Sequence, residues 1–463
     1  MKQFFAISLA LMTILSVAAW LLTPASKGTK GQTHIVWATD NNPVRQAQVD
    51  LFNKLNPDLI LTIDPMNANR EKVIVQSIGG VGPDLFDSYG YESLRAFVNS
   101  GVAADVSQEL GETGLDIGKD VWPAALPSFV LKGKAYGFPA NVSANAVWFN
   151  KNHFDEAGIP YPKPGWTWDD LVRTAAQLNK KDSRGKRVRF GFYFTFDNWP
   201  DILRTFDAWQ WSDDGVRCTL DSPQAIEAFQ LLQDMMYKHK IAPSPQDEAS
   251  LSTQGGWGSG GLPFLISERV SMAFGGRWWL NLIRKEELAR RARQAKGEKV
   301  GPPLRLGVLE LPYAHKASVV GGARCVLVNG KGRNKEAAIR FIKFLAGPDY
   351  NALLNDQADA IAPVISFSET ERFLKNPEWP DEDYNHIWRE TLRKATPDEI
   401  NPFVKGTDLA PINQQLDLIK GGLKPAKEAL QTAAKNMTAR IRRQAGLNPL
   451  LCQLYEERTG QRP

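Results

Sequence analysis

The stretch "THIVWATDNNPVRQAQVDLFNKLNPDLILTIDP", residues 33–65, decides the fold class. It opens with an apolar run that is typical of a β-strand. Pro43 then suits the first turn of a helix, and apolar side chains recur after it at helical spacing. A second run of β-forming residues starts at Leu59. A strand, a helix and a strand in this order predict an α/β protein whose mostly parallel sheet has helices on its faces.

The same alternation continues along the chain. "TWDDLVRTAAQL" (residues 167–178) starts with the capping-box pair Thr167 and Asp170. "DSPQAIEAFQLLQDMM" (residues 221–236) and "NKEAAIRFIKFLAGP" (residues 334–348) also carry helix-start signals and an apolar stripe. The polar, glycine-rich residues 246–263 predict a surface loop. Because 463 residues are too many for one ordinary core, we expect two lobes or domains.

The N-terminus predicts export from the cytoplasm. Lys2 is followed by a nearly apolar run, residues 4–22, and then by small residues at Thr23, Pro24 and Ala25. This order is typical of a signal peptide over residues 1–25. The apolar run is longer than a usual signal core and approaches membrane-spanning length, so an uncleaved anchor is the alternative. In both cases the rest of the chain is expected outside the cytoplasm, in the periplasm.

The composition argues against nucleic-acid, metal and cofactor binding. The net charge of +5 comes from 56 basic and 51 acidic residues, without a long basic block. Five scattered histidines and three scattered cysteines (Cys218, Cys325 and Cys452) predict packed thiols and no metal site. Residues 256–261 match the dinucleotide pattern GxGxxG, but no strand precedes them and no clear helix follows. We therefore expect no cofactor and no metal.

Tryptophan is the unusual residue of this chain, which has fourteen. In "GGRWWLNL", residues 275–282, Trp278 and Trp279 are adjacent. Neighbouring side chains point in different directions, so one element cannot easily pack both indoles against the same core. An indole face stacks well on the C–H groups of a sugar ring, while polar side chains pair with its hydroxyls. The pattern favours a carbohydrate ligand.

Five segments, in order, carry a resemblance to a known family. They are "GPDLFDSYGYESLRAFVNSGVAADVS" (82–107), "YGFPANVSANAVWFNKNHFDEAGI" (136–159), "PGWTWDDLVRTAAQL" (164–178), "FLISERVSMAFGGRWWL" (264–280) and "VVGGARCVLVNGKGRNKEAAIRFIKFLAGPDYNALL" (319–354). Together they resemble the family 1 extracellular solute-binding proteins, the maltose-binding-like receptors of ATP-driven (ABC) importers. The resemblance covers essentially the whole chain after the signal.

The resemblance implies a two-lobe periplasmic-binding-protein-like fold of type II with a hinged cleft. We expect an N-terminal lobe of residues 32–140 plus 323–362, and a C-terminal lobe of residues 141–322 plus 363–463. The chain would cross between them near residues 138–141, 319–322 and 362–363. The implied protein is a monomeric receptor, not an enzyme. It captures a sugar or oligosaccharide and delivers it to the membrane permease subunits of an ABC importer.

The resemblance also implies the residues of the ligand site. Trp278 matches the tryptophan that stacks on sugar in the maltose-binding relatives, whereas Trp279 is expected to pack. The loops after the first and third strands and the interlobe segment should line the cleft, with weaker candidates in the second lobe. The expected ligand-binding residues are Trp37, Asp40, Asn41, Asp87, Ser88, Tyr89, Tyr91, Asn141, Ser143, Asn145, Asp197, Trp199, Trp257, Arg277, Trp278 and Gly322.

Two alternatives stay open at this point. The first is the same fold binding a glycerol phosphodiester or a polyamine, because Arg277 and Arg324 could flank the cleft. The second is a secreted carbohydrate hydrolase, because acidic residues are abundant enough to supply a catalytic carboxylate pair.

Overall fold

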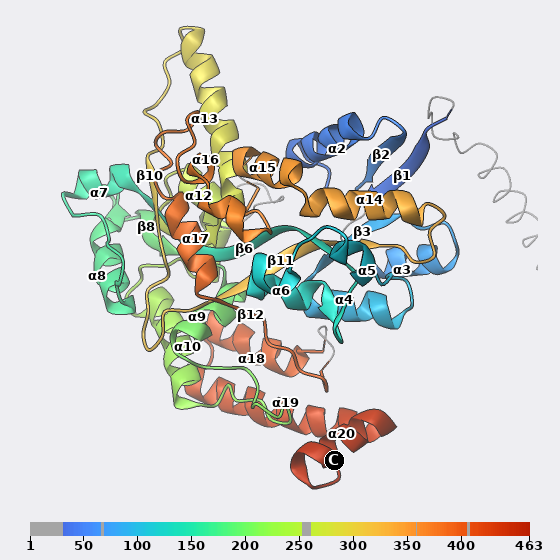
Figure 1. Cartoon of the computed structure of the whole chain (residues 1–463). Helices are drawn as coiled ribbons and strands as arrows, with labels where there is room; N and C mark the ends of the chain where they lie inside the picture. The colour runs from blue at the N-terminus through green and yellow to red at the C-terminus, as the bar shows by residue number, and fades with distance from the viewer. Residues whose placement is uncertain (1–30, 66–68, 252–260, 358, 405–407) are drawn as a thin grey trace, which may run out of the picture.

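A ten-stranded sheet runs through the molecule (Figure 1). The computed structural model describes residues 31–65, 69–251, 261–357, 359–404 and 408–463. The strand order is β2-β1-β3-β11-β6-β9-β8-β7, with β10 paired to β6 and β12 to β11. The strands are β1 Thr33–Ala38, β2 Leu59–Asp64, β3 Leu85–Tyr89, β6 Gly137–Asn150, β7 Lys180–Lys181, β8 Arg187–Tyr193, β9 Val270–Gly276, β10 Leu306–Leu309, β11 Val319–Val328 and β12 Ala395–Pro397.

The opening strand–helix–strand unit is confirmed. β1 pairs in parallel with β2 and β3, and helix α2 (Pro43–Leu55) connects β1 to β2. The Asn42 side chain accepts a hydrogen bond from the Arg45 N–H and so caps the start of α2. Helix α8 (Trp168–Leu178) has the expected capping box, and α10 (Pro223–Tyr237) and α14 (Lys335–Ala346) lie where their signals predicted them.

Two long strands join the halves of the sheet. The first part of β6 pairs with β11, whereas residues from Asn145 onward pair with β9 and β10. The chain thus passes from one half to the other within a single strand. We call the half around β2, β1 and β3 the N-terminal lobe and the half around β9, β8 and β7 the C-terminal lobe. The exact lobe boundaries in the sequence stay a prediction.

Helices flank both lobes (Figure 1). Those of the first lobe are α2, α3 (Arg70–Ile78), α4 (Gly90–Asn99), α5 (Ser107–Gly111), α6 (Ile117–Asp120), α14 and α15 (Pro348–Gln357). Those of the second are α7 (Lys151–Ala157), α8, α9 (Trp199–Thr205), α10, α11 (Pro245–Leu251), α12 (Gly261–Ile266), α13 (Leu280–Ala295), α16 (Glu371–Leu374) and α17 (Asn385–Arg393). Short elements complete the set: β4 (Val130–Leu131), β5 (Lys134–Ala135) and the 3-10 turns η1 (Pro123–Ser128), η2 (Phe196–Asn198), η3 (Arg277–Trp279) and η4 (Ile365–Glu369).

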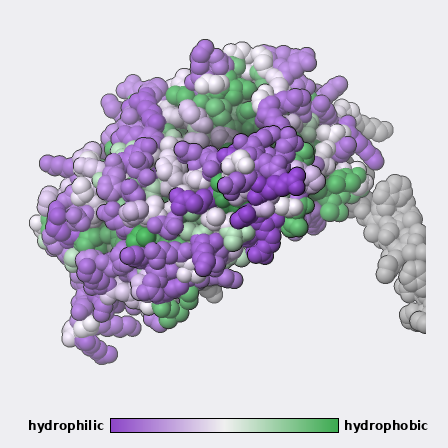
Figure 2. Space-filling view, turned by 90° about the horizontal axis from the view of Figure 1, so that it is seen from below, coloured by the Kyte–Doolittle hydropathy of each residue, from purple (hydrophilic) through white to green (hydrophobic). Residues whose placement is uncertain are grey.

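The C-terminal helices α18 (Ala410–Lys420), α19 (Ala426–Leu447) and α20 (Pro449–Thr459) lie along the lower side of the molecule in Figure 1. Gln233 of α10 donates to the backbone carbonyl oxygen of Ile419, which ties these helices to the C-terminal lobe. The surface seen from below is mostly hydrophilic, with separate hydrophobic patches (Figure 2).

Three local expectations need correction. Residues 245–251 form helix α11 rather than loop, and helix α12 begins at Gly261, where no clear helix was expected. Both helices contain good helix-forming residues, whereas the prediction of a loop rested on the glycine-rich residues between them. Cys218 and Cys325 are buried free thiols, as expected, but Cys452 is only half-buried. In the part of the chain that the structure describes, no helix has the length and apolar composition to cross a bilayer.

Candidate functional site

A pocket of about 510 Å³ lies between the lobes, where β6 and β11 cross. This volume suits a small ligand. Hollows of about 650 and 950 Å³ occur elsewhere, but their lining residues belong to the C-terminal lobe alone. The interlobe pocket is lined from both sides, by Asp40, Arg45, Tyr89, Gly90, Asn141, Ser143, Ala144, Asn145, Asp201, Trp278, Val320, Gly321, Gly322, Ala323, Arg324, Asp359, Ala360 and Asp398.

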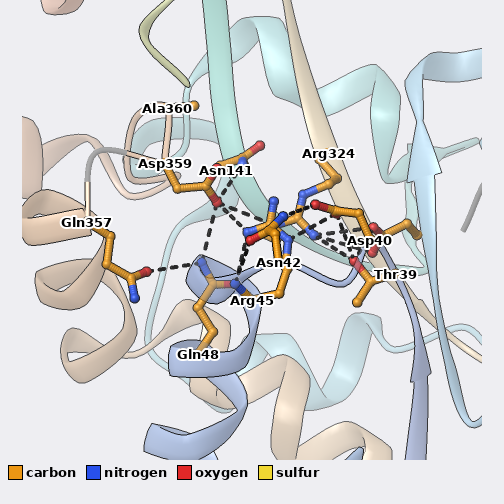
Figure 3. Close-up of polar contacts among 12 residues, drawn as sticks. Thr39, Asp40, Asn42, Arg45, Gln48, Asn141, Arg324, Gln357, Asp359 and Ala360 are labelled. Carbon is orange, nitrogen blue, oxygen red and sulfur yellow. Dashed lines mark hydrogen bonds and ion pairs between the residues drawn. The ribbon is translucent and has the colours of Figure 1, made fainter. Parts of the chain in front are cut away.

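The floor of the pocket is a cluster of five charged residues from the N-terminal lobe (Figure 3), which we call the charged floor. Arg45 pairs with Asp359 and, through Nε, with Asp40 Oδ1 at 3.2 Å. Arg324 Nη1 lies 3.3 Å from Asp87 Oδ2, and its Nη2 lies 3.8 Å from Asp359 Oδ2. The charged floor joins α2, β3, β11 and the segment after α15.

Burial and ion pairing act against each other in the charged floor. Burial alone would raise the pKa of Asp359, but Arg45 and Arg324 hold it at about 2. Burial dominates at Asp87, whose pKa is raised even though Arg324 lies beside it. Asp359 is therefore ionised at neutral pH. A hydroxyl group that reached it in the pocket could donate a hydrogen bond to this carboxylate.

Arg324 has unused hydrogen-bonding capacity. Its Nε and Nη2 atoms are buried and have no hydrogen-bond partner among the described residues. Its whole side chain is only 5% exposed, and the residue lines the pocket. A buried guanidinium without full hydrogen-bond partners is unfavourable, so these donors would pair with an acceptor atom of a ligand if a shift of the pocket lining brought the two within reach.

The opposite wall comes from the C-terminal lobe. Asn145 Nδ2 donates to Asp201 Oδ2 at 3.0 Å, and the Val320 N–H donates to Asp201 Oδ1 at the same distance. Burial raises the pKa of Asp201 to about 7. Burial also raises the pKa of Asp398, which lines the same wall. This wall presents the carboxyl groups of Asp201 and Asp398, whereas the lining arginines Arg45 and Arg324 both belong to the charged floor.

The two glycines of "GGRWW" explain how the adjacent tryptophans are placed. A Cβ atom on Gly275 would lie 2.2 Å from Cζ2 of Trp279, and one on Gly276 would lie 2.7 Å from Cδ1 of Trp278. Both indoles therefore fold back over β9 only because these positions lack a side chain. Trp279 is buried and stacks on Trp148 at a centroid distance of 6.2 Å. Trp278 is half-buried and lines the pocket.

Seven of the residues expected at the site line the pocket: Asp40, Tyr89, Asn141, Ser143, Asn145, Trp278 and Gly322. Among the other lining residues, four charged ones were not expected from the sequence, namely Arg45, Asp201, Asp359 and Asp398. Of these four residues, only Arg45 lies near a feature that is recognisable in the sequence, since it follows the cap residue Asn42 at the start of α2. The others come from separate segments, and no local pattern marks them.

Several expected residues lie elsewhere. Trp37 is fully buried because it shares the inward side of β1 with Ile35, and its Nε1–H donates to Asp87 Oδ1 at 2.9 Å. Arg277 is 1% exposed and donates to Asn385 Oδ1 at 3.0 Å and to the Ala360 carbonyl oxygen, so it supports the wall instead of lining it. Asp87 lies beneath the lining and supports Arg324.

The remaining expected residues do not line the pocket. Ser88 is fully buried in β3, and Trp199 packs against Phe229 at a centroid distance of 5.6 Å. Asn41 and Asp197 are exposed outside the pocket, and Tyr91 is half-buried against the core. Trp257 falls outside the described residues.

No group of three or more His, Cys, Asp and Glu within the described ranges is arranged to hold a metal ion. The carboxylates of the charged floor face arginines instead. An interlobe pocket crossed by two shared strands, with one aromatic wall and a charged floor, is the arrangement of a two-lobed solute receptor.

Comparisons with known proteins agree with this class. Residues 38–352 match the model of the bacterial extracellular solute-binding proteins. A binding protein of Brucella abortus is 25% identical over 368 residues, covering 76% of this chain and 80% of the relative. The sn-glycerol-3-phosphate-binding periplasmic protein of Pectobacterium atrosepticum is 21% identical, covering 85% and 87%. The solved ABC substrate-binding protein of Listeria monocytogenes in complex with cycloalternan has a TM-score of 0.72 at 21% identity, covering 88% and 98%.

The chain belongs to the bacterial extracellular solute-binding proteins, the solute receptors of ABC transporters. Members of this family are receptors and not enzymes, so the hydrolase alternative is set aside. The expected type II fold is confirmed by the match to solved receptors.

Proposed function

We propose that this receptor captures a sugar or oligosaccharide in the interlobe pocket and delivers it to the membrane permease of an ABC importer from the periplasmic side. The proposal is supported by the ligand named for the solved Listeria receptor. The chain's own chemistry supports it more directly.

The observation that carries the proposal is the mixture of unused donors and ionised acceptors around one aromatic face. A sugar hydroxyl donates one hydrogen bond and accepts others, so it can accept from Arg324 and donate to Asp359 at the same time. Trp278 offers an apolar face for the C–H side of the ring. Such groups pair with every part of a neutral polyhydroxylated ligand.

Charge argues against a phosphoester, the ligand class that the name of the Pectobacterium relative suggests. Arg45 and Arg324 are the basic residues of the pocket lining, and their charges are already engaged by the floor carboxylates. A fully ionised phosphate can accept from arginine but has no proton to donate to a carboxylate. Arg277, the other expected partner, is buried behind the wall. A bound phosphate would therefore face carboxylates without a free counter-charge.

A cationic ligand such as a polyamine is the second candidate. It is favoured by the excess of carboxyl groups over arginines in and under the pocket, which are Asp40, Asp87, Asp201, Asp359 and Asp398 against Arg45 and Arg324. It would leave the unpartnered donors of Arg324 unused, which is why a neutral sugar is preferred.

Thermal shift followed by calorimetry tests the proposal. Neutral oligosaccharides, glycerol phosphodiesters and polyamines are added to the purified protein, because a bound ligand raises the melting temperature by mass action. We expect a shift with neutral sugars only, with micromolar affinity equivalent to about −8 kcal/mol. The sugar is then recovered and analysed, and it should be unchanged. A shift with phosphodiesters or polyamines alone contradicts the proposal.

A further inference from the structure

Helix α13 projects from the body of the molecule (Figure 1). It starts directly after the Trp278–Trp279 pair, and the only buried residues in it are Leu280 and Arg284. Every residue from 291 to 299 is exposed. We call residues 280–305, which include α13 and the chain that returns to β10, the basic arm.

The root of the basic arm is firmly held. Arg284 donates two hydrogen bonds of 2.7 Å to the carboxylate of Glu382, and a third of 2.7 Å to the Asp356 carbonyl oxygen. The ring of Trp379 has Arg284 at 5.1 Å and Arg291 at 5.0 Å from its centroid. The arm is therefore presented in a fixed direction although most of its residues are exposed.

The basic arm carries the entire charge excess of the protein. It holds eight Lys and Arg against three Glu, and the rest of the chain then holds 48 of each sign. Four of its cations are exposed and have no carboxylate partner among the described residues: Lys285, Arg293, Lys296 and Lys299. Helix-dipole stabilisation explains cations in a last turn, but not Lys285 near the start of α13 or Lys299 beyond its end.

We propose that the basic arm docks the receptor on the anionic phospholipid headgroups of a membrane. Unpaired, solvated cations on a projecting support are the chemistry that recognises such a surface, at about fivefold in partitioning per charge. Receptors of this family serve ABC transporters, and the apolar residues 4–22 are expected to be a signal or an anchor. The attraction would be weak, reversible and screened by salt, which suits a receptor that must leave again.

Vesicle co-sedimentation tests this docking. The full chain is mixed with phosphatidylcholine vesicles, with or without about a third of phosphatidylglycerol, at low and high salt. The arm variant carries Lys285→Gln, Arg293→Gln, Lys296→Gln and Lys299→Gln. The control variant removes four exposed cations of α19 instead, through Lys427→Gln, Lys435→Gln, Arg442→Gln and Arg443→Gln. Circular dichroism and melting temperature verify that all three proteins are folded.

We expect salt-sensitive binding that requires the anionic lipid, a loss on the order of several hundredfold in the arm variant, and little change in the control. Binding through residues 4–22 would be insensitive to salt and would occur equally on pure phosphatidylcholine vesicles, so binding to those vesicles is subtracted before the variants are compared. The proposal is overturned if the arm variant binds anionic vesicles like the wild type after this subtraction, or if both variants lose binding equally.

Discussion

At the scale of single residues, Trp278 and Trp279 have separate tasks although they are neighbours. Trp278 borders the pocket, and Trp279 is 4% exposed within the core of the C-terminal lobe. Gly275 and Gly276 create this arrangement, because a Cβ atom at either position would overlap an indole. The pair therefore allows a test in which binding and stability respond to different substitutions.

If the proposed function is right and Trp278 stacks on the sugar at the pocket edge, Trp278→Ala should weaken sugar binding by roughly 1–3 kcal/mol while the melting temperature changes little. Trp279→Ala is the matched control and should lower the free energy of unfolding by roughly 3–5 kcal/mol, because it empties a buried aromatic stack. Calorimetric titration and denaturant unfolding measure the two effects. Unchanged affinity in Trp278→Ala, with reduced stability, would assign that indole to the core.

Asp201 predicts an unusual pH dependence of stability. Burial raises its pKa to about 7, above the value of about 4 in an unfolded chain. Between these values the folded state binds more protons than the unfolded state, so the contribution of Asp201 to stability is fully present below about pH 4 and is lost as the pH rises through 7. His153 has the opposite slope over part of this range, since burial lowers its pKa to about 4.

Comparing variants isolates the effect of Asp201. The stability of Asp201→Asn relative to wild type should rise by up to about 4 kcal/mol between pH 4 and pH 8. Denaturant unfolding across this range measures it. A His153→Gln background removes the opposing slope, and adding Asp201→Asn to that background should give the same pH-dependent difference as adding it to the wild type. A difference that is constant with pH would contradict the raised pKa.

At the scale of elements, the turn η3 is tied to the segment after α15. Arg277 of η3 donates to the Ala360 carbonyl oxygen, and Ala360 has a positive φ of 59°. The neighbouring Asp359 pairs with Arg45 of α2. One chain of contacts thus runs from the tryptophan wall of one lobe to the charged floor of the other.

Arg277→Met should lower both stability and affinity, because it leaves the Ala360 oxygen and the Asn385 side chain without their donor while keeping an apolar stem. We expect a loss of about 2–4 kcal/mol in the free energy of unfolding and a weaker sugar complex. Arg277→Lys should recover part of both. If Arg277 instead touched the ligand, as the sequence suggested, Arg277→Lys would lose affinity at unchanged stability.

Sequence reasoning was most reliable where the pattern is local. The helix and strands of residues 33–65 follow from spacing and from Pro43, and the place of Trp278 in the pocket lining follows from its motif. The prediction that Trp37 lines the site is wrong because Trp37 lies within β1, on the same inward side as Ile35. Arg45 and Asp359 lie 314 positions apart and meet only through the folded sheet, so no spacing rule could pair them.

At the scale of the whole molecule, β6 and β11 connect the lobes without interruption, and a bridge between Val142 and Ile361 adds a third connection. If the lobes move relative to one another, these shared segments are where we expect the hinge. A ligand that contacts both the charged floor and Trp278 would favour the arrangement in which these walls are closest, because only that arrangement gives it both sets of contacts.

Small-angle X-ray scattering should therefore show a smaller radius of gyration when saturating sugar is added to the wild type. Trp278→Ala should require a higher sugar concentration for the same change, since it loses contacts from one lobe only. Asn145→Ala is a second variant for comparison, because it removes the hydrogen-bond donor to Asp201 on β6 and keeps Trp278. If sugar binds with the expected affinity but leaves the radius unchanged in every variant, the lobes form one rigid body and the closure hypothesis is wrong.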